Sequence, residues 1–164
     1  MIATAVFVTL LASQSAQLTP AQTAFEHFKQ LAGDWQGASG DGTKIRHHYS
    51  VISAGSVVME ESWFDAHKDE EMVTMYHLNN GKLMLTHYCV AMNQPRLEAT
   101  RFSDDCNRVE FTFLDATNIK DRNQGHMDRV VCEFIGKDQI KSHWTWFAKG
   151  KESWMEDFVL NRVR

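Results

Sequence analysis

The chain has 164 residues, of which 43% are hydrophobic and 23% are charged, and its formal net charge is −4. This length and composition are those of one globular domain with a sizeable core, and they exclude an intrinsically disordered protein. The mildly acidic balance argues against a nucleic-acid partner, because neutralising phosphates requires a basic patch.

The N-terminal segment has the pattern of a secretory signal. Residues 2–12 form an uncharged apolar run, IATAVFVTLLA, and small polar residues follow at 13–17. The run is too short to span a bilayer, and it lacks the alternation of a half-buried strand, which is the alternative interpretation. We therefore expect residues 1–17 to be a signal peptide and residues 18–164 to form one secreted or periplasmic domain without a membrane span.

A short helix is predicted directly after this segment. Thr19 can accept hydrogen bonds from the first backbone N–H groups, and Pro20 suits the first helical position, where no N–H partner is needed. Phe25 and Phe28 lie on one apolar stripe, and Gly33 ends the helix. A helix in this position can plug one end of a barrel.

About ten strand-like segments separated by turn signals follow the helix, with no helix-length segment between them. They span residues 34–38, 44–53, 56–64, 71–78, 82–92, 96–102, 108–115, 127–135, 139–148 and 153–163. Most connections have the length of a hairpin turn, which makes antiparallel neighbours the default. The predicted fold is therefore all-β, an antiparallel up-and-down β-barrel with a short N-terminal helix, and such barrels commonly hold a small ligand.

One turn is specific enough to predict the register of its two strands. Asn80-Gly81 is the preferred pair for a two-residue type I′ turn, and it sets Thr74 opposite His87. Residues of alternating position then share one face of this hairpin: Met72, Thr74, Tyr76, Leu85, His87 and Cys89.

A second turn, centred on Lys137-Asp138, predicts the register near the end of the chain. It sets Arg129 opposite Trp146, in position for a cation–π contact, and it sets Cys132 opposite His143 on the other face. One extra residue in the turn would move every one of these side chains to the opposite face.

Gly33-x-Trp35 opens the first predicted strand, and Arg162 lies at the end of the last one. With the short helix and the ten-strand meander, these residues resemble the calycin group, which includes lipocalins and intracellular fatty-acid-binding proteins. The resemblance implies that Trp35 closes the barrel base and that Arg162 or Arg164 packs across it. The stretch 33–37 is also similar to the opening of nitrobindin-like haem barrels, and more closely to uncharacterised exported bacterial lipocalin-like domains.

The chain departs from these families in two respects. The second lipocalin motif, Thr-Asp-Tyr, is absent from the sequence. No histidine follows His143, so the late haem-ligating histidine of the nitrobindin pattern has no clear counterpart. We therefore expect no cofactor.

The eight histidines offer the widest choice of chemistry. An ordinary surface position is the simpler interpretation for His27, His47, His48 and His67. His77, His87 and His143 lie mid-strand among apolar neighbours, where they either orient a ligand or bond to neighbouring polar groups. His87 and Cys89 share a face, but no third ligand lies opposite them, so no metal site is expected.

Other polar side chains add candidates for binding and for acid–base chemistry. Arg96 can clamp a carboxylate or phosphate through its fork geometry, although a turn with Arg96 exposed is the slightly favoured alternative. Tyr88 lies beside His87 in the densest run of hydrogen-bonding residues. Glu60 and Glu61 are neighbours on a strand, so one of them points inward and becomes a general-base candidate if a histidine faces it.

The leading hypothesis is a barrel that binds a small hydrophobic or amphipathic molecule. Its candidate ligand-binding residues are His77, His87, Tyr88, Arg96, His143 and Trp144. The alternative is a barrel enzyme, an isomerase or lyase, using a His/Glu acid–base pair whose members the sequence does not identify. A third hypothesis is an interaction protein with a filled barrel. We expect a monomer or homodimer, and the three cysteines allow at most one disulfide.

Overall fold

The computed structural model describes residues 17–164, apart from the side chains of residues 67, 68 and 154. The predicted signal peptide lies outside this range except for its last residue. No helix within the described residues has the length and apolarity needed to cross a bilayer.

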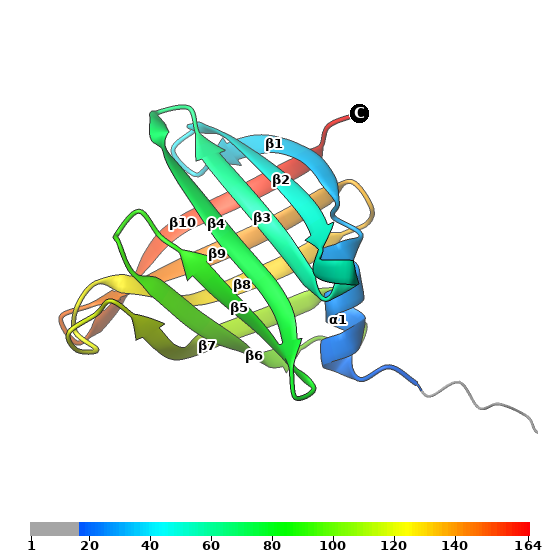
Figure 1. Cartoon of the computed structure of the whole chain (residues 1–164). Helices are drawn as coiled ribbons and strands as arrows, with labels where there is room; N and C mark the ends of the chain where they lie inside the picture. The colour runs from blue at the N-terminus through cyan, green and yellow to red at the C-terminus, as the bar shows by residue number, and fades with distance from the viewer. Residues whose placement is uncertain (1–16) are drawn as a thin grey trace, which may run out of the picture.

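Residues 17–164 form one α-helix and ten strands (Figure 1). Their bounds are α1 Pro20–Lys29, β1 Gly33–Ser39, β2 Lys44–Ile52, β3 Val57–Phe64, β4 His67–Asn79, β5 Lys82–Tyr88, β6 Gln94–Phe102, β7 Arg108–Thr117, β8 His126–Ile135, β9 Gln139–Ala148 and β10 Lys151–Arg162, with the 3-10 turn η1 Ser53–Gly55 between β2 and β3. Each strand pairs antiparallel with the next, and β10 pairs with β1. The predicted all-β, antiparallel up-and-down barrel with an N-terminal helix is therefore confirmed, and its closure leaves no open sheet edge.

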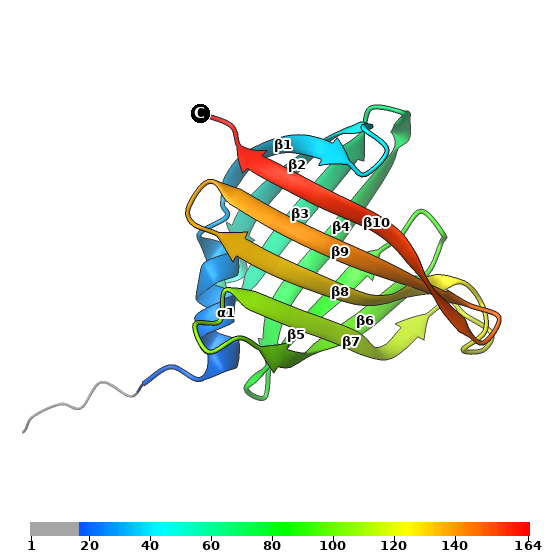
Figure 2. The same cartoon turned by 180° about the vertical axis from the view of Figure 1, so that it is seen from behind.

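The helix α1 lies against one end of the barrel (Figures 1 and 2). It begins with a capping box, in which Thr19 and Gln22 each accept a hydrogen bond from the other's backbone N–H. Phe28 is fully buried and stacks on Tyr76, with ring centroids 4.2 Å apart. The helix thus inserts an aromatic plug into the barrel interior, as its apolar stripe predicts.

Trp35 and Arg162 complete the closure of this end. Trp35 is 1% exposed, and the Arg162 guanidinium lies 4.3 Å from the centroid of its ring. The same guanidinium donates hydrogen bonds to the carbonyl oxygens of Gln30 at 2.7 Å and Ala32 at 2.9 Å, which belong to the end of the helix and its exit. These are the roles that the calycin resemblance implies, and Arg162 rather than the C-terminal arginine fills the second one.

The predicted register of the β4–β5 hairpin is confirmed. Thr74 pairs with His87 and Tyr76 pairs with Leu85 across the Asn80-Gly81 turn. All four side chains are buried, so the face that carries them is the inner face of the barrel.

The predicted register of the β8–β9 hairpin is wrong by one residue. Ile135 pairs with Gln139, which leaves a three-residue loop where a two-residue turn was predicted. Cys132 therefore pairs with Ser142 rather than with His143, and Arg129 pairs with Thr145 rather than with Trp146. The slip exchanges the two faces of β9 relative to the prediction.

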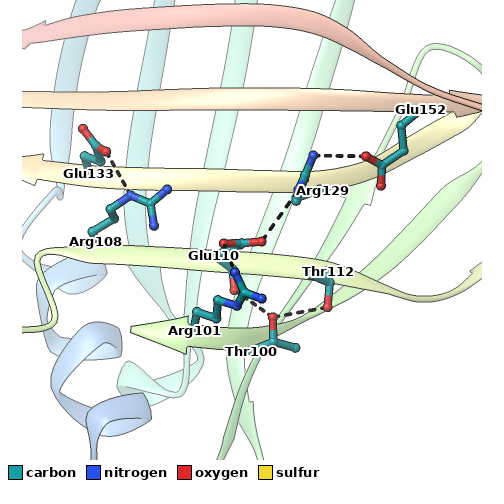
Figure 3. Close-up of polar contacts among 8 residues, drawn as sticks. All are labelled: Thr100, Arg101, Arg108, Glu110, Thr112, Arg129, Glu133 and Glu152. Carbon is teal, nitrogen blue, oxygen red and sulfur yellow. Dashed lines mark hydrogen bonds and ion pairs between the residues drawn. The ribbon is translucent and has the colours of Figure 1, made fainter. Parts of the chain in front are cut away.

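The outer face of β6, β7, β8 and β10 carries a chain of ion pairs (Figure 3). Arg129 contacts Glu110 at 3.8 Å and Glu152 at 3.1 Å, and Arg101 contacts Glu110 at 3.9 Å. Arg129 thus makes ion pairs in place of the predicted cation–π contact. Because these arginines are solvent-exposed to a large degree, the pairs add little stability and chiefly mark the side of the sheet that faces water.

Candidate functional site

A cavity of about 380 Å³ lies at the barrel end opposite α1, where the turns β3–β4 and β5–β6 are found. We call this end the open end. The large apolar side chains of the cavity wall are aromatic or methionine: Phe64, Met72, Met127, Trp144, Trp146, Met155 and Phe158. The wall also has four buried polar side chains: His47, Glu60, Ser62 and His87. A largely apolar pocket with a few convergent polar groups is the usual form of a small-molecule site.

Glu60 lies at the centre of these buried polar side chains. Its Oε2 accepts a hydrogen bond from the Tyr76 hydroxyl at 2.7 Å, and its Oε1 lies 2.9 Å from Nδ1 of His47. Both ring nitrogens of His47 are buried without a hydrogen bond. His47 is 4% exposed and Glu60 is 6% exposed, so the pair is held away from water.

This arrangement keeps Glu60 ionised and the hydroxyls of Tyr49 and Tyr76 protonated. Burial alone would raise the pKa of Glu60, but the attraction of His47 and the hydrogen bond from Tyr76 outweigh it and hold the pKa below its usual value. Burial, together with the charge of Glu60, raises the pKa of Tyr49 and Tyr76 well above the ordinary value. Tyr76 is therefore a protonated donor at neutral pH.

His87 faces the cavity from β5. Its Nδ1 lies 2.9 Å from Oγ1 of Thr74, its ring centroid is 4.9 Å from that of Trp144, and its Nε2 is buried without a hydrogen bond. Burial lowers the pKa of His87 to about 4, although the charge of Glu60 opposes the shift. The imidazole is therefore uncharged at neutral pH.

The three cysteines are all free and buried. Cys89 lines the cavity near its mouth, and burial raises the pKa of its thiol and of the Cys132 thiol. Neither thiol is a ready nucleophile, because the thiolate is the reactive form. Among the described residues, no three His, Cys, Asp or Glu side chains gather closely enough to hold a metal ion.

Two of the six predicted ligand-binding residues, His87 and Trp144, line the cavity. His77 and Tyr88 do not, and Tyr88 is 48% exposed. Successive side chains of a strand point to opposite faces, so the inward orientation of His87 turns Tyr88 outward. His77 pairs with Met84 and occupies the same outward face as Tyr88. His77 and Tyr88, two of the predicted ligand-binding residues, therefore do not line this cavity.

Arg96 and His143 also lie on the outer face. Arg96 makes a bidentate ion pair with Asp115, its neighbour on β7, so the alternative of an exposed arginine is the one observed. His143 contacts Asp157 on β10. In the observed β8–β9 register, His143 pairs with Val131 on the solvent side, and Trp144 pairs with Val130 on the inner face.

The sequence interpretation missed His47, which it placed at the surface. On β2, burial alternates through Ile45, His47 and Tyr49. This alternation of two large apolar residues about a histidine was the signal that could have found it. Of the adjacent pair on β3, Glu60 points inward beside His47, which is the arrangement named as a general-base candidate.

Comparison with known proteins informs the fold. The sequence matches no protein-family model and no curated protein. The crystal structure of Rv2717c from M. tuberculosis is similar, with a TM-score of 0.60 and 14% identity over 90% of this chain and 100% of that one. A protein of unknown function from the DUF3598 family of Nostoc punctiforme PCC 73102 has a TM-score of 0.54 and 12% identity over 83% of this chain. The alignment covers 49% of the Nostoc protein, so this chain spans about half its length. These similarities concern the fold alone and carry no functional assignment.

Proposed function

We propose that this calycin-like barrel binds a small, partly apolar molecule in the cavity at its open end. The observation that supports this most strongly is a pair of buried nitrogens, Nε2 of His47 and Nε2 of His87, that have no hydrogen bond and belong to residues lining the cavity. A buried polar atom without a partner costs about 1–3 kcal/mol. A polar group on a bound molecule can supply the missing partner.

The shape and chemistry of the wall support the same proposal. The volume of about 380 Å³ is that of a pocket rather than of a packing defect. Trp144, Trp146 and Phe158 offer flat apolar surface, and Met72 and Met127 offer adaptable side chains between them. A ligand with an apolar body and one or two polar atoms matches this wall.

Native mass spectrometry of the purified protein tests the proposal. We expect the wild-type protein to carry an adduct of small-molecule mass that is released on denaturation. The substitution Met72→Trp fills the cavity from β4 and is expected to abolish the adduct, because the added side-chain volume occupies the binding space. Met75→Trp, on the outer face of the same strand, is the matched control and is expected to retain it. Equal adduct in both variants, or none in the wild type, would argue against the cavity as a binding site.

An acid–base enzyme is the second candidate, and one specific observation favours it. Glu60, His47 and Tyr76 form a buried carboxylate–imidazole–phenol group at the inner wall of the cavity. Such a group can move a proton between two positions of an enclosed substrate. An isomerase would return the bound molecule at the same mass with a changed chromatographic retention, whereas a carrier would return it unchanged.

Export of the chain is a further part of the proposal. It is supported by the uncharged apolar run at residues 2–12 and the small polar residues that follow.

A further inference from the structure

The cavity wall carries carboxylates without a basic side chain as long as lysine or arginine. The acidic residues that line it are Glu60, Glu70 and Glu156, and no lysine or arginine is among the described lining residues. Glu156 lies at the rim, where its Oε1 accepts a hydrogen bond from the backbone N–H of Gly40 at 2.9 Å. Arg96, the one arginine that the sequence offered as a clamp for an anionic head group, lies on the outer face and is paired with Asp115.

We propose that the ligand is an organic cation, a primary amine carried on a small aromatic or aliphatic body; this inference rests on the proposed binding function. An ammonium group would be attracted to the buried carboxylate of Glu60. An anionic ligand would instead place a second negative charge in the same water-poor space, with no lysine or arginine among the described lining residues to offset it.

The unpartnered Nε2 of His87 fits the hydrogen-bonding needs of an ammonium group, which has three donors and no acceptor. In a neutral imidazole that carries its hydrogen on Nδ1, Nε2 presents a lone pair. Nδ1 of His87 faces the Thr74 hydroxyl at 2.9 Å, and this hydroxyl can accept that hydrogen. Nε2 of His87 is then an acceptor on a residue that lines the cavity.

The aromatic wall adds a second attraction for a cation. Trp144, Trp146 and Phe158 line the same cavity, and the faces of such rings attract cations, most strongly where water is excluded. The acidic rim residue Glu156 favours entry of a cation over entry of an anion. A neutral alcohol can use the same imidazole nitrogen of His87, but it gains neither the attraction of the Glu60 carboxylate nor the cation–π attraction. Neutral alcohols are therefore the competing class of ligand.

Three indole probes that differ only in their head group separate these classes. Tryptamine carries an ammonium, tryptophol a hydroxyl and indole-3-propionate a carboxylate, and isothermal titration calorimetry at about pH 7.5 keeps the amine charged. We expect tryptamine to bind about tenfold more tightly than tryptophol and the carboxylate to show no measurable binding. Equal or tighter binding of tryptophol or the carboxylate overturns the cation inference but leaves the binding function standing.

Absence of tryptamine binding also overturns the cation inference. The binding function fails with it only if native mass spectrometry of the wild-type protein shows no adduct, so the two failures are distinguishable. An adduct recovered from the protein that has no basic nitrogen would likewise overturn the inference alone.

Charge-removing variants locate the selectivity. Glu60→Gln is expected to reduce the preference for tryptamine over tryptophol from about tenfold to near parity, with tryptophol affinity retained. Glu61→Gln, the next residue on β3 and outward-facing, is the matched control and is expected to keep the full preference. Persistence of the preference in Glu60→Gln would overturn the inference.

Glu60 contacts His47 and accepts a hydrogen bond from Tyr76 in the barrel interior, so its substitution can unfold the protein. Glu156→Gln therefore provides a second variant, at the rim of the cavity. It is expected to weaken tryptamine binding about threefold while leaving tryptophol binding unchanged. An unchanged affinity for tryptamine in Glu156→Gln, measured at low ionic strength, would count against the acidic wall as the source of selectivity.

Discussion

His87 is the residue at which burial, charge and position in the cavity act together. Burial lowers the pKa of His87 from its ordinary value of 6.5 to about 4. Between these two pH values the unfolded chain binds a proton that the folded protein does not. The contribution of the neutral His87 imidazole to folding stability is therefore fully present above about pH 6.5 and is lost as the pH falls towards 4.

The low pKa of His87 predicts a pH dependence of the free energy of unfolding that a single substitution removes. On acidification from about pH 7 to 4.5, the free energy of unfolding of the wild type should fall by about 2 kcal/mol more than that of His87→Gln. Urea titration at the two pH values measures the difference. His143→Gln, on the outer face and accessible to water, is the control and should follow the wild type. Parallel losses in wild type and His87→Gln would show that His87 is not held neutral by burial.

The residues of the site divide into those that the sequence could mark and those that it could not. His87 could be predicted because the Asn80-Gly81 turn fixes its register and its partner Thr74. His47 is marked over His48 only by the apolar residues two positions away on each side, Ile45 and Tyr49, because the adjacency of the two histidines says only that they face opposite sides of the strand.

At the scale of elements, the length of a turn decides which side chains of the following strand face the barrel interior. The β8–β9 loop spans residues 136–138, and Gly136, its first residue, has a φ of 64°, a left-handed conformation that glycine adopts without strain. The sequence there fits a two-residue or a three-residue loop equally well, so the faces of β9 were open to either assignment. The closed end was predictable in more detail, because Trp35 and Arg162 have roles that depend on their places at the strand ends.

Arg162, at the end of β10, is a position at which even a conservative substitution should lower the free energy of unfolding. Its guanidinium donates hydrogen bonds to three carbonyl oxygens, those of Gln30, Ala32 and Lys137, and stacks on Trp35. Lysine has neither the fork nor the planar face, so Arg162→Lys should lower the free energy of unfolding by about 2 kcal/mol. Urea midpoints measure this loss. Arg164→Lys, at a surface ion pair with Asp138, should change stability by less than about 0.5 kcal/mol, and an equal effect of the two changes would contradict the assigned role.

At the scale of the whole molecule, the two ends of the barrel differ in what fills them. The end at α1 is packed by Phe28, Trp35 and the Arg162 guanidinium. The open end instead holds the cavity, with Trp144 and Trp146 in its wall. One closed end gives the barrel a rigid base and limits a ligand to entry from the other end.

The measurement that tests this cavity most directly is a set of ¹H–¹⁵N spectra recorded while tryptamine or tryptophol is added. The indole N–H signals of the tryptophans report on separate parts of the molecule, since Trp144 and Trp146 line the cavity and Trp35 lies in the closed end. Binding at the proposed site predicts saturable shifts of the Trp144 and Trp146 signals, with the Trp35 signal unmoved. Shifts confined to tryptophans outside the cavity, or no shift with either probe, would contradict a binding site inside the barrel.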